Sequence, residues 1–296
     1  MITFPAVRPV LLLLVLASIW SSSFAVIKIG VETLPPMTLA ALRITLAAIV
    51  LYGYALFNQM PIPRDSKYWV LAFLVGFFGN GLPFTLIGWG EQVIDSGLAA
   101  ILMAVMPLST VLLVHVFSSD ERLTGQKLVG ILVGFGGVIV LVGPETLKYM
   151  GGDALRQSAV ACGAFSYAIA TTIAKNMIRL HPAVSGSGVM LTGALQMVIL
   201  SLTCDQPWLL VPSIKSLVAA AYLGLFPTAL ATFLYFYLLR IRGATFISFN
   251  NYIIPGLGVI WGAIFLNEHV SVQEMVALGL ILSGIAIAGI RGQSTP

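Results

Sequence analysis

Hydroxyl, amide and aromatic side chains recur inside long apolar segments of this chain, and these are the groups that could bind a small molecule there. Asparagine is the most informative of them, because an unpaired amide in hydrocarbon costs several kcal/mol. Charged residues lie at or near the ends of these segments instead. A charge at the bilayer centre usually marks an ion pathway or a proton relay. The pattern therefore indicates a neutral, zwitterionic or amphipathic substrate, met by hydroxyls, amides and aromatic faces.

Six of the apolar segments carry residues that we expect to bind this substrate. The candidates are Trp20, Ser21, Asn80, Phe84, Met103, Tyr167, Thr171, Tyr235, Asn250 and Asn251. Proline removes a backbone hydrogen bond from a helix, so prolines inside such segments are candidate hinges. They are Pro83, Pro107 and Pro255. Each group also has a structural interpretation: hydroxyls bond back to their own helix, aromatic rings anchor at the lipid interface, methionines fill gaps and prolines merely kink.

The composition shows what kind of element must position these residues. Hydrophobic residues make up 58% of the 296 residues, charged residues only 9%, and the mean hydropathy is +1.00. Soluble domains carry about a quarter charged residues, so this chain belongs in a lipid bilayer. We predict an all-α integral membrane protein with ten transmembrane helices. The predicted spans are 9–28, 36–57, 68–89, 95–117, 126–143, 157–177, 182–203, 213–239, 244–266 and 272–291.

The two halves of the chain repeat each other about 147 residues apart. Matched pairs are Lys28 with Lys175, Pro35 with Pro182, Gly76 with Gly224, Pro107 with Pro255, Glu121 with Glu268, Gln126 with Gln273 and Gly137 with Gly284. Five spans per copy place the second copy in the membrane upside down. The sequence thus predicts two inverted five-helix repeats, residues 1–147 and 148–296. In transporters of this construction the substrate site lies at the repeat interface, and matched prolines offer the same bend in each half.

Small residues and aliphatic spans indicate where helices pack closely. Gly130 with Gly134 and Gly258 with Gly262 form small-xxx-small pairs that let helix backbones approach each other. The spans 126–143 and 272–291 are almost purely aliphatic apart from glycines. We expect these two spans to serve packing rather than substrate binding.

Basic residues separate the two sides of the predicted bundle. The side that holds both termini carries ten Lys and Arg residues, and the other side carries four. By the positive-inside rule both termini of the multi-pass chain are cytoplasmic. Three carboxylates lie on the inner side and eight on the outer side. Arg43, near the outer end of its span, is expected to join the outer minority or to snorkel to the surface.

Other function classes lack their usual residues. The chain has no His-Glu-x-x-His motif, no Gly-x-Ser-x-Gly motif and no carboxylate pair at mid-membrane, so we do not expect an enzyme, a metal or a cofactor. Cys162 and Cys204 lie in separate spans and indicate no disulfide framework. The net charge of +4 is dispersed over loops and does not indicate nucleic-acid binding. The expected partners are a small-molecule substrate and the lipid bilayer, and nothing in the sequence indicates an oligomeric state.

Several of these features together resemble the EamA family of the drug/metabolite transporter superfamily. They are Trp20-Ser21 in the first span, Pro107 followed by Asp120-Glu121, Pro255 followed by Asn267-Glu268, and Gln126 and Gln273 opening the last span of each half. The resemblance covers nearly the whole chain. It implies export of small metabolites across the bacterial inner membrane through a central cavity that opens to one side at a time.

Within this family the chain is most similar to the YddG-type amino-acid exporters, which implies aromatic and other apolar amino acids as cargo, with amphipathic drugs as further candidates. Smaller multidrug relatives carry an acidic residue in the first span. The stretch from Leu11 to Ile27 has none, which argues against proton-coupled drug antiport. Two alternatives stay open: a broad-specificity drug or nucleotide-sugar carrier, which Lys28 or Lys175 pointing inward would favour, and more remotely an intramembrane enzyme.

Overall fold

The computed structural model is mostly helical in the residues that it describes, which are 7–103, 105–106, 108–110, 113, 125–142, 152–174, 177, 180–242 and 250–289. No strand occurs in these residues, and the all-α prediction is confirmed. Pro107, Lys175 and Glu121 lie outside the described residues. So does the predicted boundary between residues 147 and 148.

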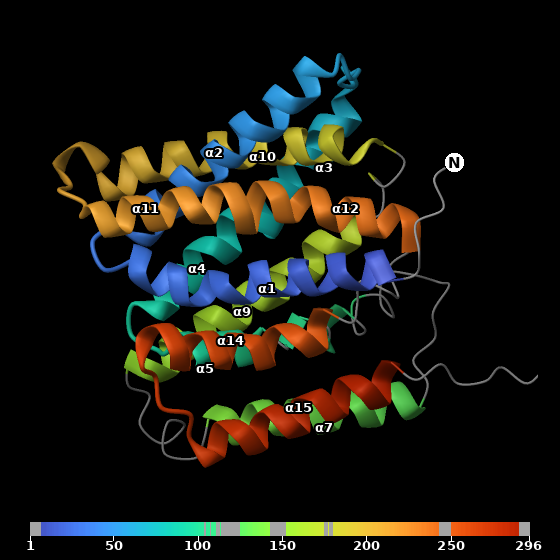
Figure 1. The fold of residues 1–296 in the computed structure, drawn as a ribbon, viewed down its shortest axis with the longest axis vertical. Coiled ribbons are helices and arrows are strands. Elements are labelled where there is room, and N and C mark those ends of the chain that lie inside the picture. Colours follow the sequence, from blue (N-terminus) through green and yellow to red (C-terminus); the bar gives the residue numbers. More distant parts are fainter. Residues whose placement is uncertain are drawn as a thin grey trace, which may run out of the picture.

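The helices lie side by side in one elongated stack (Figure 1). In the first half they are α1 (Val7–Gly30), α2 (Pro36–Phe57), α3 (Ser66–Gly76), η1 (Phe77–Gly81), α4 (Leu82–Glu91), α5 (Ser96–Leu102) and α7 (Gly125–Val142). In the second half they are α9 (Gly152–Ala174), α10 (Pro182–Leu200), η3 (Ser201–Asp205), η4 (Pro207–Leu209), α11 (Ile214–Leu223), η5 (Gly224–Leu230), α12 (Ala231–Arg242), α14 (Asn250–Leu266) and α15 (Val272–Gly289).

Five of these helical segments are long and apolar enough to cross a membrane by themselves. The other apolar helices are shorter within the described residues. Local sequence sets several of the starts: prolines open α2 and α10, where a missing amide costs nothing. The carboxylate of Asp65 accepts a hydrogen bond from the amide of Tyr68 at 2.9 Å and caps α3. Within the described residues, the segments that the sequence predicts as membrane spans are helical.

Contacts between helices follow the repeat. Helix α1 packs on α11 and α12, and its counterpart α9 packs on α3, η1 and α4. Helix α1 also packs on α14 as α9 packs on α5, and α2 packs on η5 and α11 as α10 packs on η1 and α3. The pairs α2 with α10, α5 with α14 and α7 with α15 each join a helix to its own counterpart. Exchanging the two halves leaves this set of contacts unchanged, as a two-fold axis between two repeats requires.

The pair of α7 and α15 shows the symmetry at the level of single atoms. Gln126 Nε2 donates to the carbonyl of Ile287 at 3.2 Å, and Gln273 Nε2 donates to the carbonyl of Val140 at 2.8 Å. Both the donors and the acceptors are 147 residues apart. Because each glutamine opens its helix and bonds to the end of the other, the two helices are antiparallel. The repeats are inverted.

Glycines explain how closely these two helices approach. A Cβ atom on Gly284 would stand 2.6 Å from the carbonyl oxygen of Gly130 and 2.6 Å from Cα of Gly134. The predicted packing role of Gly130 and Gly134 is thereby confirmed. The reciprocal contact places a Cβ on Gly137 2.9 Å from the amide nitrogen of Ile281. Gly258 likewise packs against α5, where Ala100 is its neighbour.

Two helices are interrupted at matching repeat positions. Residues of η1 and of η5 form π-helical turns, which break the continuous α-helical hydrogen bonding of the third and eighth spans. At the offset of 148 that pairs Gly76 with Gly224, the two breaks begin within one residue of each other in the repeat. Such π-turns occur frequently at functional sites. Of the predicted hinges, Pro83 follows η1 directly and Pro255 lies within the continuous helix α14, while Pro227 in η5 was not predicted.

Candidate functional site

A buried arginine lies beside the breaks in the helices. Arg43 of α2 is only 4% exposed, so the expectation that it snorkels to the surface is wrong. Its Nε donates to Thr228 Oγ1 in η5 at 3.0 Å, and Thr228 donates in turn to the carbonyl of Leu223 at 2.7 Å. The backbone of Arg43 lies about 10 Å from the start of α2, at a helical rise of 1.5 Å per residue. A guanidinium from the first half is therefore fixed inside the bundle by a hydroxyl from the second.

Aromatic rings surround this guanidinium. Its Cζ lies 3.6 Å from the ring centroid of Phe84, a cation–π contact. Phe84 meets Tyr167 of α9 edge to face, with the ring centroids 6.4 Å apart. Both rings are half-buried although their helices lie inside the stack. The structure thus brings together two of the sequence candidates, Phe84 and Tyr167, around a cation that was not among them.

A buried carboxylate lies on the same face of α4. Glu91 is 0% exposed, and within the described part of the chain neither carboxylate oxygen has a hydrogen-bond partner. The backbone of Lys28 approaches the Glu91 carboxylate without hydrogen-bond geometry. The charged groups that interact with Glu91 electrostatically are Lys28, Glu268 and Arg43. Glu91 ends α4, as expected for a charge near a span end, but the sequence did not indicate that tertiary packing buries both Glu91 and Arg43.

Trp20 contacts the break in the opposite repeat. Its Nε1 donates to the carbonyl of Pro227 in η5 at 3.1 Å, and its ring lies 5.8 Å from that of Tyr235. Across the repeat, Ser166 of α9 donates to the carbonyl of Phe78 in η1 at 2.6 Å. The first helix of each half therefore satisfies a carbonyl in the interrupted helix of the other. Trp20 has a structural bond in addition to any contact with a substrate.

We expect Trp20→Phe to destabilise the protein, because the carbonyl of Pro227 loses its indole donor while the aromatic packing is largely kept. An unsatisfied polar group inside a protein costs about 1 to 3 kcal/mol. The midpoint of thermal unfolding in detergent should fall accordingly. Trp208→Phe is the matched control, because Trp208 is exposed and such surface changes stay within about 0.5 kcal/mol. Equal midpoints for the two variants would contradict the assigned role.

The other sequence candidates have mixed surroundings. Ser21 accepts from Trp261 Nε1 at 2.8 Å, and Thr171 donates to the carbonyl of Tyr167 at 2.8 Å, so both serve helix contacts. Met103 packs at the edge of an apolar cluster. Asn80 is buried within η1, and Asn250 is 2% exposed with its amide unpaired among the described residues. The backbone of Asn251 belongs to α14, while its side chain lies outside what the structure describes.

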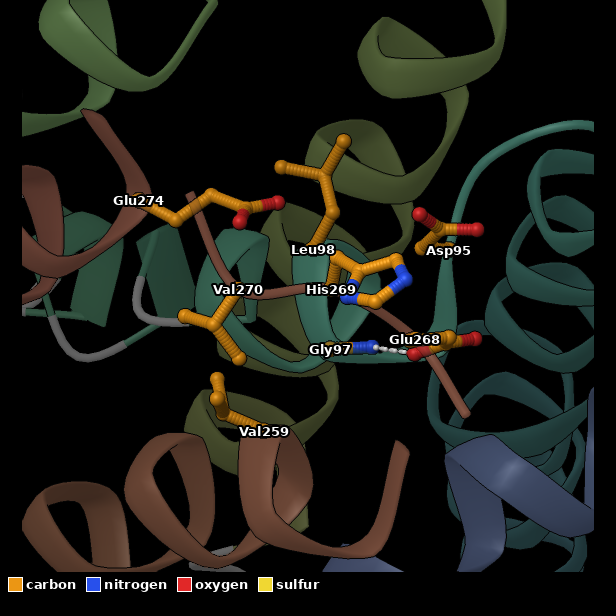
Figure 2. A pocket seen from close by; sticks show the side chains of 8 residues that line it. All are labelled: Asp95, Gly97, Leu98, Val259, Glu268, His269, Val270 and Glu274. Carbon is orange, nitrogen blue, oxygen red and sulfur yellow. Dashed lines mark hydrogen bonds between the residues drawn. The ribbon is translucent and has the colours of Figure 1, made fainter. Parts of the chain in front are cut away.

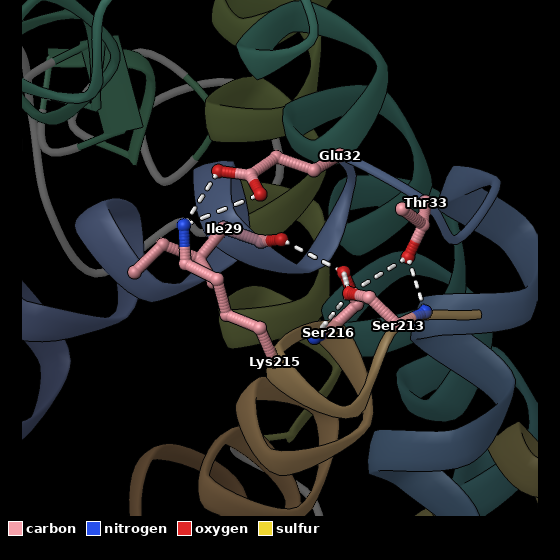
Figure 3. Close-up of polar contacts among 6 residues, drawn as sticks. All are labelled: Ile29, Glu32, Thr33, Ser213, Lys215 and Ser216. Atoms are coloured by element: carbon pink, nitrogen blue, oxygen red, sulfur yellow. Dashed lines mark hydrogen bonds and ion pairs between the residues drawn. The ribbon is translucent and has the colours of Figure 1, made fainter.

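Polar contacts join the two halves at one end of the stack, on the left in Figure 1. We call this end, which holds Glu32, Asp95, Asp205 and Glu268, the acidic end. Figure 3 shows part of the contact: Lys215 Nζ lies 3.0 Å from Glu32 Oε1, and Ser216 donates to the carbonyl of Ile29. Ser213 belongs to the same network.

Further polar contacts lie at the acidic end: those of Asp205 and Arg156 join the two halves, and that of Lys28 lies within the first half. Asp205 accepts from the amide and the hydroxyl of Thr38, each at 2.8 Å. Lys28 donates to Asp95 at 3.1 Å and to the carbonyl of Ile94 at 2.7 Å. Arg156, at the start of α9, donates to the carbonyl of Trp89. In this conformation the acidic end is closed by bonds between the halves, and Lys28 is engaged there rather than pointing inward.

Glu268 caps a helix of the opposite half. Its carboxylate accepts from the amide of Ser96 at 2.9 Å and from the Ser96 hydroxyl at 2.8 Å. It also accepts from the amide of Gly97 at 3.1 Å (Figure 2). These groups begin α5, whose N-terminal amides favour a negative charge. Figure 2 also shows His269 and Glu274 beside a pocket of about 10 Å³, which has room for roughly one water molecule.

A larger pocket of about 380 Å³ lies between α2, α3 and α10, lined in part by Tyr52, Arg64 and Trp69. Neither pocket is lined by any of the predicted binding residues. Among the described residues, no group of His, Cys, Asp and Glu could hold a metal ion. The candidate site is therefore the buried cluster of Arg43, Phe84 and Tyr167 with Glu91, not a surface pocket.

Comparison with known proteins assigns both halves to one family. The model of the EamA-like transporter family matches residues 7–143 and again residues 157–290. The chain is 28% identical over 273 residues to the "Uncharacterized inner membrane transporter YedA" of Escherichia coli, covering 91% of this chain and 86% of that one. It is 27% identical to an "Uncharacterized transporter" of Archaeoglobus fulgidus, covering 90% and 94%.

A solved structure shares the fold. A crystal structure with 21% sequence identity superposes with a TM-score of 0.68, covering 95% of this chain and 97% of the other. At that identity the likeness concerns the fold alone. Together with the double match of the family model, it agrees with the two-repeat architecture.

Proposed function

The chain belongs to the EamA-like transporter family, and from this premise we propose that it exports amino acids with aromatic or other apolar side chains by alternating access. It is a multi-pass membrane transporter, and the family membership concerns nearly its whole length. The amino-acid substrate, the direction of transport and the placement of both termini in the cytoplasm belong to the proposal.

The observation that carries the proposal is the set of aromatic side chains gathered at the two matched helix breaks. Trp20 and Tyr235 lie at η5, and Phe84 and Tyr167 lie just beyond η1. Aromatic faces supply large apolar contact area for an aromatic or aliphatic side chain. Because they come from both halves, a movement of one half against the other would rearrange them, as alternating access requires.

The closed acidic end supports a sidedness for this cycle. The excess of basic residues on the opposite side supports an outward-facing acidic end under the positive-inside rule, and the carboxylates at this end are consistent with it. The described conformation would then be shut toward the outside. The name of the Escherichia coli relative supports an inner-membrane location. Lys28 is held by Asp95, so its position does not favour a nucleotide-sugar carrier.

Reconstitution tests the proposal. The purified protein in proteoliposomes should take up labelled phenylalanine, leucine and related amino acids with saturation, above the level of protein-free liposomes. The measurement is initial uptake with and without a pH gradient, and gradient-independent uptake would indicate facilitated diffusion. If no amino acid of the panel is transported, the proposed substrate class is wrong.

A further inference from the structure

Resting on this proposed function, we propose that Arg43 and Glu91 form a zwitterion site, in which Arg43 binds the carboxylate of the transported amino acid and Glu91 binds its ammonium group. Arg43 is 4% exposed and Glu91 is 0% exposed. They act on each other electrostatically, yet no ion pair joins them among the described contacts. A buried guanidinium and a buried carboxyl group that are not paired with each other are complementary to a ligand that carries both an ammonium group and a carboxylate.

Arg43 is oriented for such a ligand. Its Nε is used by Thr228, and its planar face lies on the ring of Phe84. A guanidinium carries five N–H donors in a fixed fork, so its terminal nitrogens keep donors for a carboxylate. Bidentate bonding of this kind is the geometry in which arginine recognises carboxylates. Thr228 and Phe84 are positioning residues here, and Arg43 is the binding group.

Glu91 lies where it can face the same ligand. It follows Phe84 by seven residues on α4, which is about two helical turns, or roughly 10 Å, on the same helix face. Side chains on a helix lean toward its N-terminus, so the carboxylate of Glu91 leans back toward Phe84 and the guanidinium on it. A ligand between them would place its apolar side chain near Phe84 and Tyr167.

The neighbouring charges do not neutralise this pair. Lys28 is bonded to Asp95, and Glu268 is bonded to the start of α5. Burying an unpaired charge is costly, and removing one partner of a buried pair leaves the other uncompensated. The retention of both charges is explained if the substrate completes the pairing during each transport cycle.

The repeat adds an independent argument. The position 147 residues after Arg43 is Met190, which is buried and apolar, and the position 148 residues after Glu91 is Leu239. The packing and the helix breaks are duplicated, whereas these two charges occur in one half only. Residues needed for movement should occur at matching positions in both halves. Two charges that occur in one half only therefore fit substrate recognition better than movement.

Three related compounds test the assignment: L-phenylalanine, 3-phenyllactate, which has a hydroxyl in place of the ammonium group, and phenethylamine, which lacks the carboxylate. Counterflow in proteoliposomes gives their initial rates. Glu91→Gln should lower the phenylalanine rate about tenfold or more while phenyllactate is transported at least as fast as by the wild type, because only the ammonium loses its partner. Arg43→Gln should lower the transport rates of both phenylalanine and phenyllactate, because each carries a carboxylate. Arg43→Lys should restore part of these rates.

The ratio of phenylalanine to phenyllactate separates recognition from folding, because a poorly folded variant loses both rates together. Glu274→Gln is the matched control, since Glu274 is a half-buried carboxylate at the same end that accepts from the amide of Ser271, and it should leave the ratio unchanged. An unchanged ratio in Glu91→Gln, with amino acids still transported by the wild type, would overturn this inference alone. Failure of the wild type to transport any amino acid would overturn the proposed function as well.

Discussion

A disulfide formed after Thr33→Cys and Ser213→Cys is expected to reduce transport about tenfold or more, because it would lock the acidic end closed. Thr33 Oγ1 lies 3.3 Å from Ser213 Oγ and accepts from the amide of Ser213 at 3.0 Å. Short side chains at this separation suit the Cβ–Cβ distance of a disulfide, about 3.8 Å. The two residues belong to opposite halves. Uptake into proteoliposomes is measured after oxidation in a Cys162→Ser, Cys204→Ser background.

The matched control places a disulfide within one half. Ser213 Oγ donates to Ser216 Oγ at 3.2 Å in the first turn of α11, so Ser213→Cys with Ser216→Cys should crosslink without joining the halves. Transport should persist in that variant. A reductant should restore transport in the crosslinked Thr33 and Ser213 variant. Full transport while that crosslink is intact would show that the acidic end does not open during the cycle.

The spacing of Gln126 and Gln273 shows how far sequence reasoning reached. Residues 147 apart predicted a duplicated helix, and the odd number of spans per copy predicted its inversion. The structure confirms both in the reciprocal bonds to Ile287 and Val140. Such features are predictable because each follows from periodic hydrophobicity and matched spacing, which are properties of the chain alone.

Arg43 and Glu91 show where sequence reasoning failed. Both lie near span ends, where a charge can ordinarily reach water, and Arg43 was expected to join the outer minority or to snorkel. Their burial depends on Phe84, on Thr228 from the opposite half and on the contacts that close the acidic end. The signal available was their asymmetry, since neither charge has a charged counterpart in the other repeat. The sequence also did not predict the hydrogen bond between Trp20 and Pro227. No local sequence pattern indicates a contact between residues 207 positions apart.

Gly284→Ala is expected to be the most damaging of the small substitutions in α15. Its new Cβ would lie 2.6 Å from the carbonyl oxygen of Gly130 and from Cα of Gly134, and backbone atoms cannot move aside as a flexible side chain can. Forcing a methyl group into such packing typically costs about 1 to 3 kcal/mol, and a rigid backbone contact favours the upper end. The midpoint of thermal unfolding in detergent should fall, and α15 should become accessible to protease.

Gly279→Ala is the control within the same helix, because nothing lies within 4 Å of a Cβ at that position. Alanine favours helix over glycine by up to about 1 kcal/mol, so this variant should be neutral or slightly stabilised. The inverted repeat predicts the same contrast in α7. Gly137→Ala meets backbone atoms of Ala277 and Ile281, whereas Gly136→Ala meets open space. Equal midpoints within either pair would mean that close backbone packing does not hold these helices together.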